Sequence, residues 1–211
     1  MKNNEIPLLP GRMYHIYNHA NGKEMLFSKR ENQLFFLAKY ALHIEPVAKT
    51  FAYCLMSNHI HFAVQTKDLE ALTNAYCEKY TDRVIAANFV LGDKEAAAFV
   101  SRSFGNLFSS YTQAYNKQQS RIGSLFIPNF KRKEIETPGY LGNVIHYIHS
   151  NPVHHGFAKK MMDWEFSSIH GYWMEKQTRL AKEKGLEAFE GIERFKAQHQ
   201  RESPFLIEFE F

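Results

Sequence analysis

Residues 12–19 alternate between apolar and polar side chains, residues 50–56 form an apolar strand pattern, and residues 59–65 alternate again. In a β-strand successive side chains point to opposite faces, so each stretch is predicted to be a strand. The third stretch has on one face His59, His61, Ala63 and Gln65, and on the other Ile60, Phe62 and Val64. We expect the polar face to be accessible and the apolar face to be buried. Ser57-Asn58 is predicted to join the second and third strands as a hairpin turn.

Apolar residues recur at helical spacing in four further stretches, residues 28–44, 69–80, 104–119 and 138–150. This spacing predicts an α-helix in each of them. Ser28 can cap the first helix. In the last helix, Pro138 suits the first turn, and Pro152 is expected to force the helix to end.

Two connecting segments are less regular. Residues 81–103 are rich in alanine and predict one or two short helical pieces, and residues 123–130 predict a short strand, which Pro128 confines to a sheet edge or an interruption. The resulting order of strand, helix, two strands and helix, followed by a late strand and helix, is typical of ferredoxin-like folds. We therefore expect an α+β protein with an antiparallel sheet and its helices on one face.

The chain changes character after Trp173. Residues 175–200 are rich in Lys, Glu and Arg with helically spaced Leu and Phe, and residues 204–211 form a short alternating apolar tail. The sequence therefore predicts one main domain, residues 1–174, followed by a charged helical extension, residues 175–211.

The composition narrows the class of protein. Apolar residues make up 45% of the 211 residues, which is enough for a substantial core and excludes a disordered chain. No stretch approaches the roughly 20 apolar residues of a membrane span, and the first residues lack the apolar region of a secretory signal. We therefore expect a cytoplasmic protein, in which Cys54 and Cys77 are reduced thiols.

The distribution of charge points to a polyanionic partner. The formal net charge is only +4, but residues 96–133 contain no Asp or Glu. The basic residues of this window, which we expect to follow a DNA backbone, are Arg102, Lys117, Arg121, Lys131, Arg132 and Lys133. A basic surface without any ligand is the alternative. The apolar and aromatic stripe through Tyr111 and Tyr115 is expected to be core, because its spacing is helical.

Candidate chemistry centres on two histidines and a tyrosine. His59 and His61 leave one strand face roughly 6.5 to 7 Å apart, a spacing that lets two imidazoles converge on one divalent ion. Tyr147 and Asn151 lie four residues apart and therefore share one helix face. A tyrosine attacks phosphorus efficiently only beside a cation or a proton acceptor, because its pKa is near 10. Taken singly, these residues also suit hydrogen-bonded sheet histidines, a core aromatic and a helix stop.

Neighbouring residues offer alternatives. Tyr140, two turns before Tyr147 on nearly the same face, is the rival nucleophile. His149 is two positions from Tyr147 and is expected to point away from it, toward the surface or the sheet. His154 and His155 lie beyond Pro152 and are expected to be solvated or to reach a phosphate.

Two segments together resemble a known family. The hairpin Met56-Ser-Asn-His-Ile-His-Phe62 is similar to the HUH motif, two histidines flanking an apolar residue, of the single-tyrosine transposases. The segment Tyr147-Ile-His-Ser-Asn-Pro-Val153 resembles their tyrosine-bearing helix, particularly in the branch associated with repetitive extragenic palindromes (REP). Supporting segments occur in the family's order at residues 14–17, 123–133 and 163–168, so the resemblance covers roughly residues 12–174.

The resemblance implies both an activity and a site. It implies cleavage and rejoining of single-stranded DNA at hairpins by an HUH endonuclease that forms a 5′-phosphotyrosine link through Tyr147. It also implies that His59, His61 and Asn151 bind Mg²⁺ or Mn²⁺. The REP-associated branch favours a monomer over a homodimer. A hairpin-binding protein that has lost cleavage is the main alternative, and a zinc hydrolase lacks a third acidic ligand.

The chain departs from the family's pattern at four places. Ser57 stands where relatives often have Pro, and His154-His155 replaces the usual Arg-Ala after Asn-Pro-Val. Residues 81–103 and 175–211 are longer than a minimal member needs. The first two changes leave the implied metal ligands intact. The extensions bear on the oligomeric state and on which hairpin is recognised.

Overall fold

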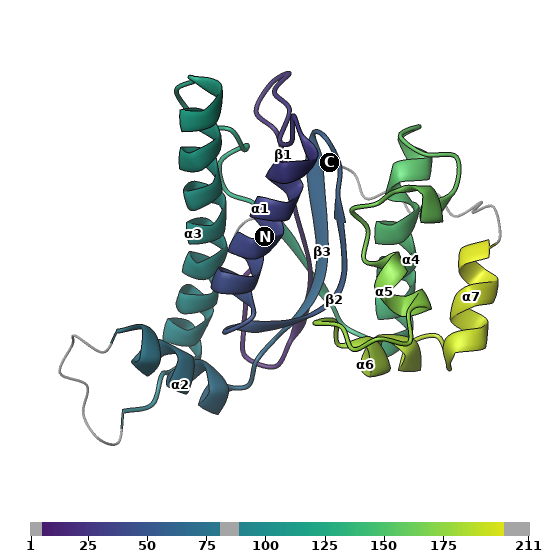
Figure 1. The fold of residues 1–211 in the computed structure, drawn as a ribbon. Coiled ribbons are helices and arrows are strands. Elements are labelled where there is room, and N and C mark those ends of the chain that lie inside the picture. The colour runs from purple at the N-terminus through teal and green to yellow at the C-terminus, as the bar shows by residue number, and fades with distance from the viewer. Residues whose placement is uncertain (1–5, 81–88, 201–211) are drawn as a thin grey trace.

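A four-stranded antiparallel sheet forms the centre of the protein (Figure 1). The computed structural model describes residues 6–80 and 89–200. The strands are β1 (Met13–His19), β2 (Ala48–Leu55), β3 (His59–Thr66) and β4 (Lys131–Ile135). They are ordered β2-β3-β1-β4 with every neighbouring pair antiparallel, which is the arrangement of two interleaved split βαβ units. The predicted ferredoxin-like α+β class is confirmed.

Helices cover both faces of this sheet. They are α1 (Arg30–Ile44), α2 (Leu69–Lys79), α3 (Asp93–Gln119), α4 (Pro138–His154), α5 (Ile169–Trp173), α6 (Lys182–Glu187) and α7 (Ile192–Gln200), with a 3₁₀ turn at Met161–Asp163. Figure 1 shows α1 and α3 on one side of the sheet and α4 to α7 on the other. The expectation of helices on one face is therefore wrong, because the segment after β4 returns to cover the second face.

The alternation of β3 explains why two cores form. Ile60, Phe62 and Val64 face the first core, beneath α1 and α3. Ala63 faces the second core, together with Ala52 and Cys54 of β2. These small side chains let α4 pack closely on the sheet. The histidine face of β3 was expected to be accessible, but α4 buries it.

Most predicted boundaries lie close to the observed ones. The described part of the segment 81–103 is different, because a single helix, α3, begins at Asp93 and runs to Gln119. Residues 81–88 of that segment lie outside the described residues. The stripe through Tyr111 and Tyr115 is buried, as expected. Ser28 is not the cap of α1: Lys29 is the N-cap, and the Ser28 hydroxyl donates to Asn32 Oδ1 at 3.1 Å.

The predicted strand at residues 123–130 does not form. Ala20 and Phe126 make only an isolated bridge, and the strand itself, β4, begins at Lys131. Pro128 lacks the N–H that a ladder needs, and Asn129 adopts a left-handed conformation with a φ of 62°. These two residues interrupt the extended backbone just before β4.

Pro152 does not stop α4 where expected, because the helix continues to His154. A proline in the last turn removes only one N–H from the helical ladder. The backbone N–H of His155 still donates to the carbonyl of Asn151 at 3.0 Å. Asn151 therefore lies within the helix, one turn after Tyr147.

Part of the predicted C-terminal extension packs against α4. The expected helix is two short helices, α6 and α7, and the apolar tail at residues 204–211 lies outside the described residues. Phe195 of α7 is fully buried and stacks on Tyr172 with ring centroids 4.6 Å apart. At Gly142 of α4, an added Cβ would lie 2.8 Å from the Ala188 carbonyl oxygen, so this approach requires glycine. Residues 182–200 thus share the second core with the helix that carries Tyr147.

Two further expectations concern single features of the chain. Cys54 and Cys77 are both unbridged, Cys54 being buried. Across residues 6–80 and 89–200, no helix has the length and apolar character that a membrane span requires.

Candidate active site

Strands β1 and β3 together build a layer of imidazole and aromatic rings. In their antiparallel register, His19 lies opposite His59, and Tyr17 lies opposite His61. Residues directly opposite in such a pair share a sheet face. The His19 and His59 rings stack with centroids 4.7 Å apart, and the Tyr17 and His61 rings stack at 5.8 Å. We call His15, Tyr17, His19, His59 and His61 the histidine layer.

Hydrogen bonds orient both histidines of the HUH motif. His59 Nδ1 lies 2.8 Å from Asn58 Oδ1, and His61 Nδ1 lies 2.9 Å from His15 Nε2. Because Nδ1 is engaged in both rings, Nε2 is the nitrogen that each ring would present to a metal ion. A hydrogen bond on the second ring nitrogen is the usual support of a metal-binding histidine.

Helix α4 covers this layer with Tyr147 and Asn151. The Tyr147 ring stands edge-on to His61 with centroids 5.6 Å apart, and to His15 at 5.8 Å. Asn151 Nδ2 donates to the Tyr147 carbonyl at 2.8 Å. The Asn151 side chain also lies beside His59, where it favours the protonated ring. The structure therefore brings together all four residues that the sequence analysis named for the metal and the nucleophile.

Burial keeps the two motif histidines neutral. His59 is 1% exposed and His61 is 0% exposed. Burial, assisted by neighbouring histidines, lowers the pKa of His59 to about 3 and holds the pKa of His61 well below its ordinary value. A neutral imidazole is the form that binds metal ions, so both rings are in the coordinating state at neutral pH.

Tyr147 is poorly ionised in this environment. Tyr147 is only 8% exposed. Burial raises the pKa of Tyr147 to about 12, although the Asn151 side chain partly opposes the shift. Very little phenolate exists at neutral pH, so a nucleophilic role requires a cation or a proton acceptor near the phenol oxygen.

The donor atoms fit a divalent cation that keeps several oxygen ligands. Two neutral imidazoles and one amide oxygen would leave the remaining coordination positions to water and phosphate, as Mg²⁺ and Mn²⁺ prefer. Within residues 6–80 and 89–200, no group of three or more His, Cys, Asp or Glu side chains has metal-site geometry. Asn151 would then be the third protein ligand.

Alternation along β4 divides the basic cluster at residues 131–133. Lys131 lies opposite Tyr17 and Lys133 opposite His15, so both belong to the face of the histidine layer. Arg132 faces the other core and is 8% exposed. Its guanidinium lies 4.5 Å from the Phe130 ring centroid, and Nη1 donates to Ser101 Oγ at 3.2 Å. The Arg132 side chain thus packs against α3, away from the histidine layer, and a contact with DNA stays a prediction.

The remaining predicted DNA contacts lie away from the histidine layer. Arg102 and Lys117 are exposed on α3, which covers the opposite face of the sheet. Arg121 is held by Glu24 at 2.9 Å and by the Ser124 carbonyl at 3.3 Å, so it braces a turn. Of the six basic residues, the structure brings Lys131 and Lys133 to the candidate site.

We expect the double substitution Lys131→Gln and Lys133→Gln to weaken binding of single-stranded DNA. Each lost phosphate contact should reduce the slope of log affinity against log salt concentration by about 0.7, giving a change of about 1.4 for the pair. The measurement is a series of fluorescence-anisotropy titrations at different salt concentrations. The matched control replaces Arg102 and Lys117 with Gln on the opposite face. An equal slope change in this control would contradict the assignment of the binding face.

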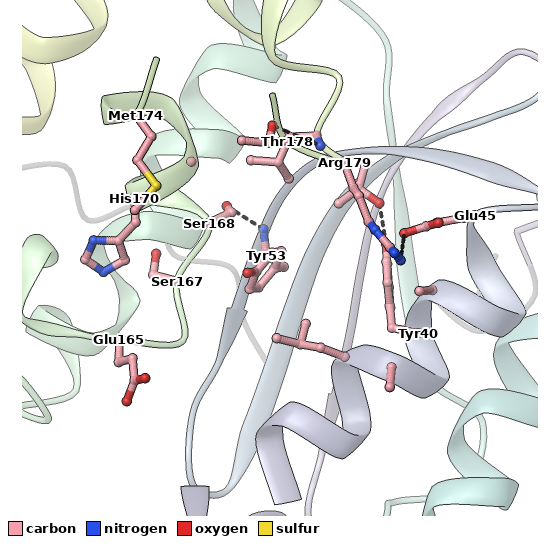
Figure 2. A pocket seen from close by; sticks show the side chains of 16 residues that line it. Tyr40, Glu45, Tyr53, Glu165, Ser167, Ser168, His170, Met174, Thr178 and Arg179 are labelled. Atoms are coloured by element: carbon pink, nitrogen blue, oxygen red, sulfur yellow. Dashed lines mark hydrogen bonds and ion pairs between the residues drawn. The ribbon is translucent and has the colours of Figure 1, made fainter. Parts of the chain in front are cut away.

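Two cavities differ in their relation to the histidine layer. The smaller, about 340 Å³, is lined by Tyr17, Asn18, His19, Ala20, Gly22, Ile127, Asn129 and Lys131. It therefore opens beside the layer. The larger, about 500 Å³, lies at the β2 edge over α1 and shares no residue with the layer. Figure 2 shows its lining, in which Arg179 donates to Glu45 at 3.1 Å and Ser168 Oγ accepts from the Tyr53 N–H at 2.8 Å.

Three residues of the site, His15, Tyr17 and His19, were not identified from the sequence. His15, Tyr17 and His19 alternate in the predicted first strand, and this spacing could have identified them as one face. The His155 ring meets the His59 ring at a centroid distance of 4.7 Å, a contact that depends on how α4 lies over the sheet.

Tyr140 and His149, the two neighbours of Tyr147 considered as alternatives, have different surroundings. Tyr140 packs near Lys133, whose Nζ is 5.6 Å from its ring centroid. His149 does point away from Tyr147, but it is fully buried rather than on the surface. Its two ring nitrogens lie 2.8 Å from Ser168 Oγ and 2.9 Å from His199 Nε2. His149 thus links α4 to the start of α5 and to α7.

Comparisons with known proteins point to one group. No family model matches the chain. A Haemophilus influenzae protein that carries the provisional name REP-associated tyrosine transposase is 25% identical over 124 residues, which are 58% of this chain and 59% of that protein. The chain therefore spans about three fifths of that relative's length.

A solved structure, described as a REP-associated tyrosine transposase bound to a REP hairpin, shares the fold. Its TM-score is 0.56 at 16% sequence identity, and the match covers 78% of this chain and 81% of the other. Sequence similarity and shared fold lead to the same group, the one that the segments at residues 56–62 and 147–153 resemble. The chain is thus a relative of the REP-associated tyrosine transposases.

Proposed function

We propose that this protein is a metal-dependent endonuclease and strand transferase that acts on single-stranded DNA at hairpins. The observation that carries the proposal is the packing of Tyr147 and Asn151 against His59 and His61. A potential nucleophile, an amide oxygen and two neutral imidazoles meet in one layer, although they come from segments about 90 residues apart. Such a set suits phosphoryl transfer better than it suits a purely structural core.

In the proposed reaction the phenol oxygen of Tyr147 attacks the scissile phosphorus. A bond forms between this oxygen and phosphorus, and the bond from phosphorus to the 3′-oxygen breaks. The phenol loses its proton, and the departing 3′-oxygen gains one. The products are a 5′-phosphotyrosine link and a free 3′-hydroxyl. Attack by a 3′-hydroxyl on the link reverses the reaction and rejoins strands, so no external energy source is needed.

His59, His61 and Asn151 would hold Mg²⁺ or Mn²⁺. When bound, the cation polarises the scissile phosphate and lowers the cost of forming phenolate. The protein's own contribution is orientation: Asn58 and His15 hold the imidazoles, and the bond from Asn151 Nδ2 to the Tyr147 carbonyl holds the amide. Lys131 and Lys133 would attract the DNA backbone to the same face.

A DNA hairpin beside the cleaved strand is the proposed substrate, since the structural relative is described as bound to a REP hairpin. We also propose that the protein acts as a monomer. The test incubates the purified protein with labelled single-stranded DNA that carries a hairpin, in the presence of Mn²⁺. The expected result is a protein–DNA adduct that survives denaturation. No adduct across a panel of hairpins bound with measurable affinity would contradict the cleavage proposal.

We expect His61→Ala, or chelation of the wild type with EDTA, to reduce adduct formation at least about a hundredfold, since removing a principal electrostatic stabiliser costs on the order of 3 kcal/mol. Adding Mn²⁺ back should restore the chelated wild type but not the variant. The matched control is His154→Ala, an exposed histidine beyond the layer. Equal adduct yield from His61→Ala and wild type would show that this imidazole is not a ligand.

The burial of Tyr147 favours a second candidate, a hairpin-binding protein that does not cleave. A residue that is 8% exposed, with its pKa raised to about 12, is poorly placed to attack unless DNA or a cation changes its surroundings. This candidate predicts hairpin affinity that is insensitive to EDTA, with no adduct under any metal condition. The same labelled-DNA assay therefore separates the two functions.

A further inference from the structure

His15 contacts both halves of the candidate site. It lies in β1 and is 1% exposed. Its Nε2 is 2.9 Å from His61 Nδ1, and the two rings are nearly parallel, with centroids 5.1 Å apart and an angle of 20°. The Tyr147 ring stands edge-on to the same imidazole at 5.8 Å. His15 therefore contacts both a proposed metal ligand and the proposed nucleophile.

The bond between His15 and His61 contains one proton, because each neutral imidazole carries a proton on one nitrogen. Either His61 donates from Nδ1 or His15 donates from Nε2. A metal ion at His61 Nε2 needs a lone pair on that nitrogen, so the ring proton must then be on Nδ1. In that state His61 donates and His15 accepts.

The two motif histidines differ in how this state is secured. His59 Nδ1 faces Asn58 Oδ1, an oxygen that can only accept, so the local amide selects the Nδ1–H tautomer. His61 Nδ1 faces an imidazole that could also donate. The tautomer of His61 therefore depends on the tautomer of His15.

We propose that His15 is a positioning residue that accepts the Nδ1 proton of His61 and so directs His61 Nε2 toward the metal ion. This inference rests on the proposed metal-dependent function. In addition, the His15 ring supports the edge of the Tyr147 ring, which couples the orientation of the nucleophile to that of the ligand.

The first test compares two substitutions of His15 by Mn²⁺ titration. In His15→Gln, a side-chain oxygen near the position of Nε2 can still accept the proton, whereas His15→Leu offers no acceptor. We expect Leu to weaken Mn²⁺ binding 10- to 100-fold, the usual effect of losing such a support, and Gln to restore most of the affinity. Equal losses in both variants, or no loss in either, would overturn the proposal. Circular dichroism and thermal unfolding confirm that each variant is folded.

The second test needs no metal. Long-range ¹H–¹⁵N spectra of histidine-labelled protein report which ring nitrogen carries the proton. In the metal-free wild type we expect His61 to be the Nδ1–H tautomer, and in His15→Leu to shift toward Nε2–H. A wild-type His61 protonated on Nε2 would overturn the inference whatever the protein's activity.

A reference variant separates failure of this inference from failure of the proposed function. His61→Ala should abolish Mn²⁺ binding if the metal site is correct. If it does not, the proposed metal site is wrong, and the spectra still decide the tautomer. If His61→Ala abolishes binding while His15→Leu binds like the wild type, the metal site stands and His15 has no positioning role.

Discussion

Replacing Tyr147 with phenylalanine is expected to abolish the covalent protein–DNA adduct and to leave hairpin affinity within about twofold of the wild type, a change of less than 0.5 kcal/mol. The substitution removes one hydroxyl and keeps the ring that packs on His61 and His15. Without the phenol oxygen, the phosphorus has no protein nucleophile. The measurement is denaturing electrophoresis of labelled hairpin DNA, together with a binding titration under native conditions.

Tyr140→Phe is the matched control, because Tyr140 is on the same helix two turns before Tyr147, with its ring centroid 5.6 Å from Lys133 Nζ. It should form the adduct at close to the wild-type rate. If Tyr140→Phe loses the adduct while Tyr147→Phe retains it, the nucleophile is Tyr140. Retention in both variants would remove tyrosine from the proposed mechanism.

We expect the metal-free protein to unfold in acid at about pH 5. The histidines with strongly lowered pKa values are His15, His59, His61, His149 and His199, in each case chiefly because of burial. Their folded values lie below the unfolded value near 6.5, so the unfolded chain binds protons that the folded chain excludes. Their contribution to stability is fully present above about pH 6.5 and is lost as the pH falls through the folded values, which are about 3 for His15, His59 and His199.

The expected loss is up to about 1.4 kcal/mol per pH unit for each of these histidines. Since a domain is stable by about 5–15 kcal/mol, several such groups exhaust the stability within two pH units. Urea unfolding at a series of pH values, with EDTA present, measures the slope. His199→Gln should lower proton uptake on unfolding by up to one. A free energy of unfolding that is constant between pH 7 and pH 5 would contradict the prediction.

The features of the candidate site that depend on local periodicity could be predicted from the sequence. The period of two along residues 59–65 correctly divided His59 and His61 from Ile60, Phe62 and Val64. Helical spacing correctly put Tyr147 and Asn151 on one face, and they are joined by a hydrogen bond of 2.8 Å. The order of strands and helices was likewise sufficient to predict the sheet. The roles of these residues in metal binding and catalysis stay predictions.

Two predictions were limited in different ways. In one, the alternation of side chains along a strand was not applied, and in the other, tertiary packing outweighed the tendency of proline to end a helix. The same period of two along β4 separates Lys131 and Lys133 from Arg132, and applying it would have predicted that Arg132 lies on the other face of the sheet. Pro152 was expected to end α4. However, packing on the sheet outweighs one missing helical hydrogen bond, and the helix continues to His154.

The sequence by itself determined the first three strands, most of the helices, and the faces on which the candidate metal ligands and Tyr147 lie, because these depend on residues within a few positions of one another. Only the tertiary structure decided that α4 covers the histidine face, that β1 contributes His15 and His19, and that residues 182–200 support the tyrosine helix. Each of these depends on which apolar surfaces pack together, and the pattern within a single segment does not specify its partner. Burial beneath α4 also sets the neutral state of His59 and His61, on which their proposed role as ligands depends.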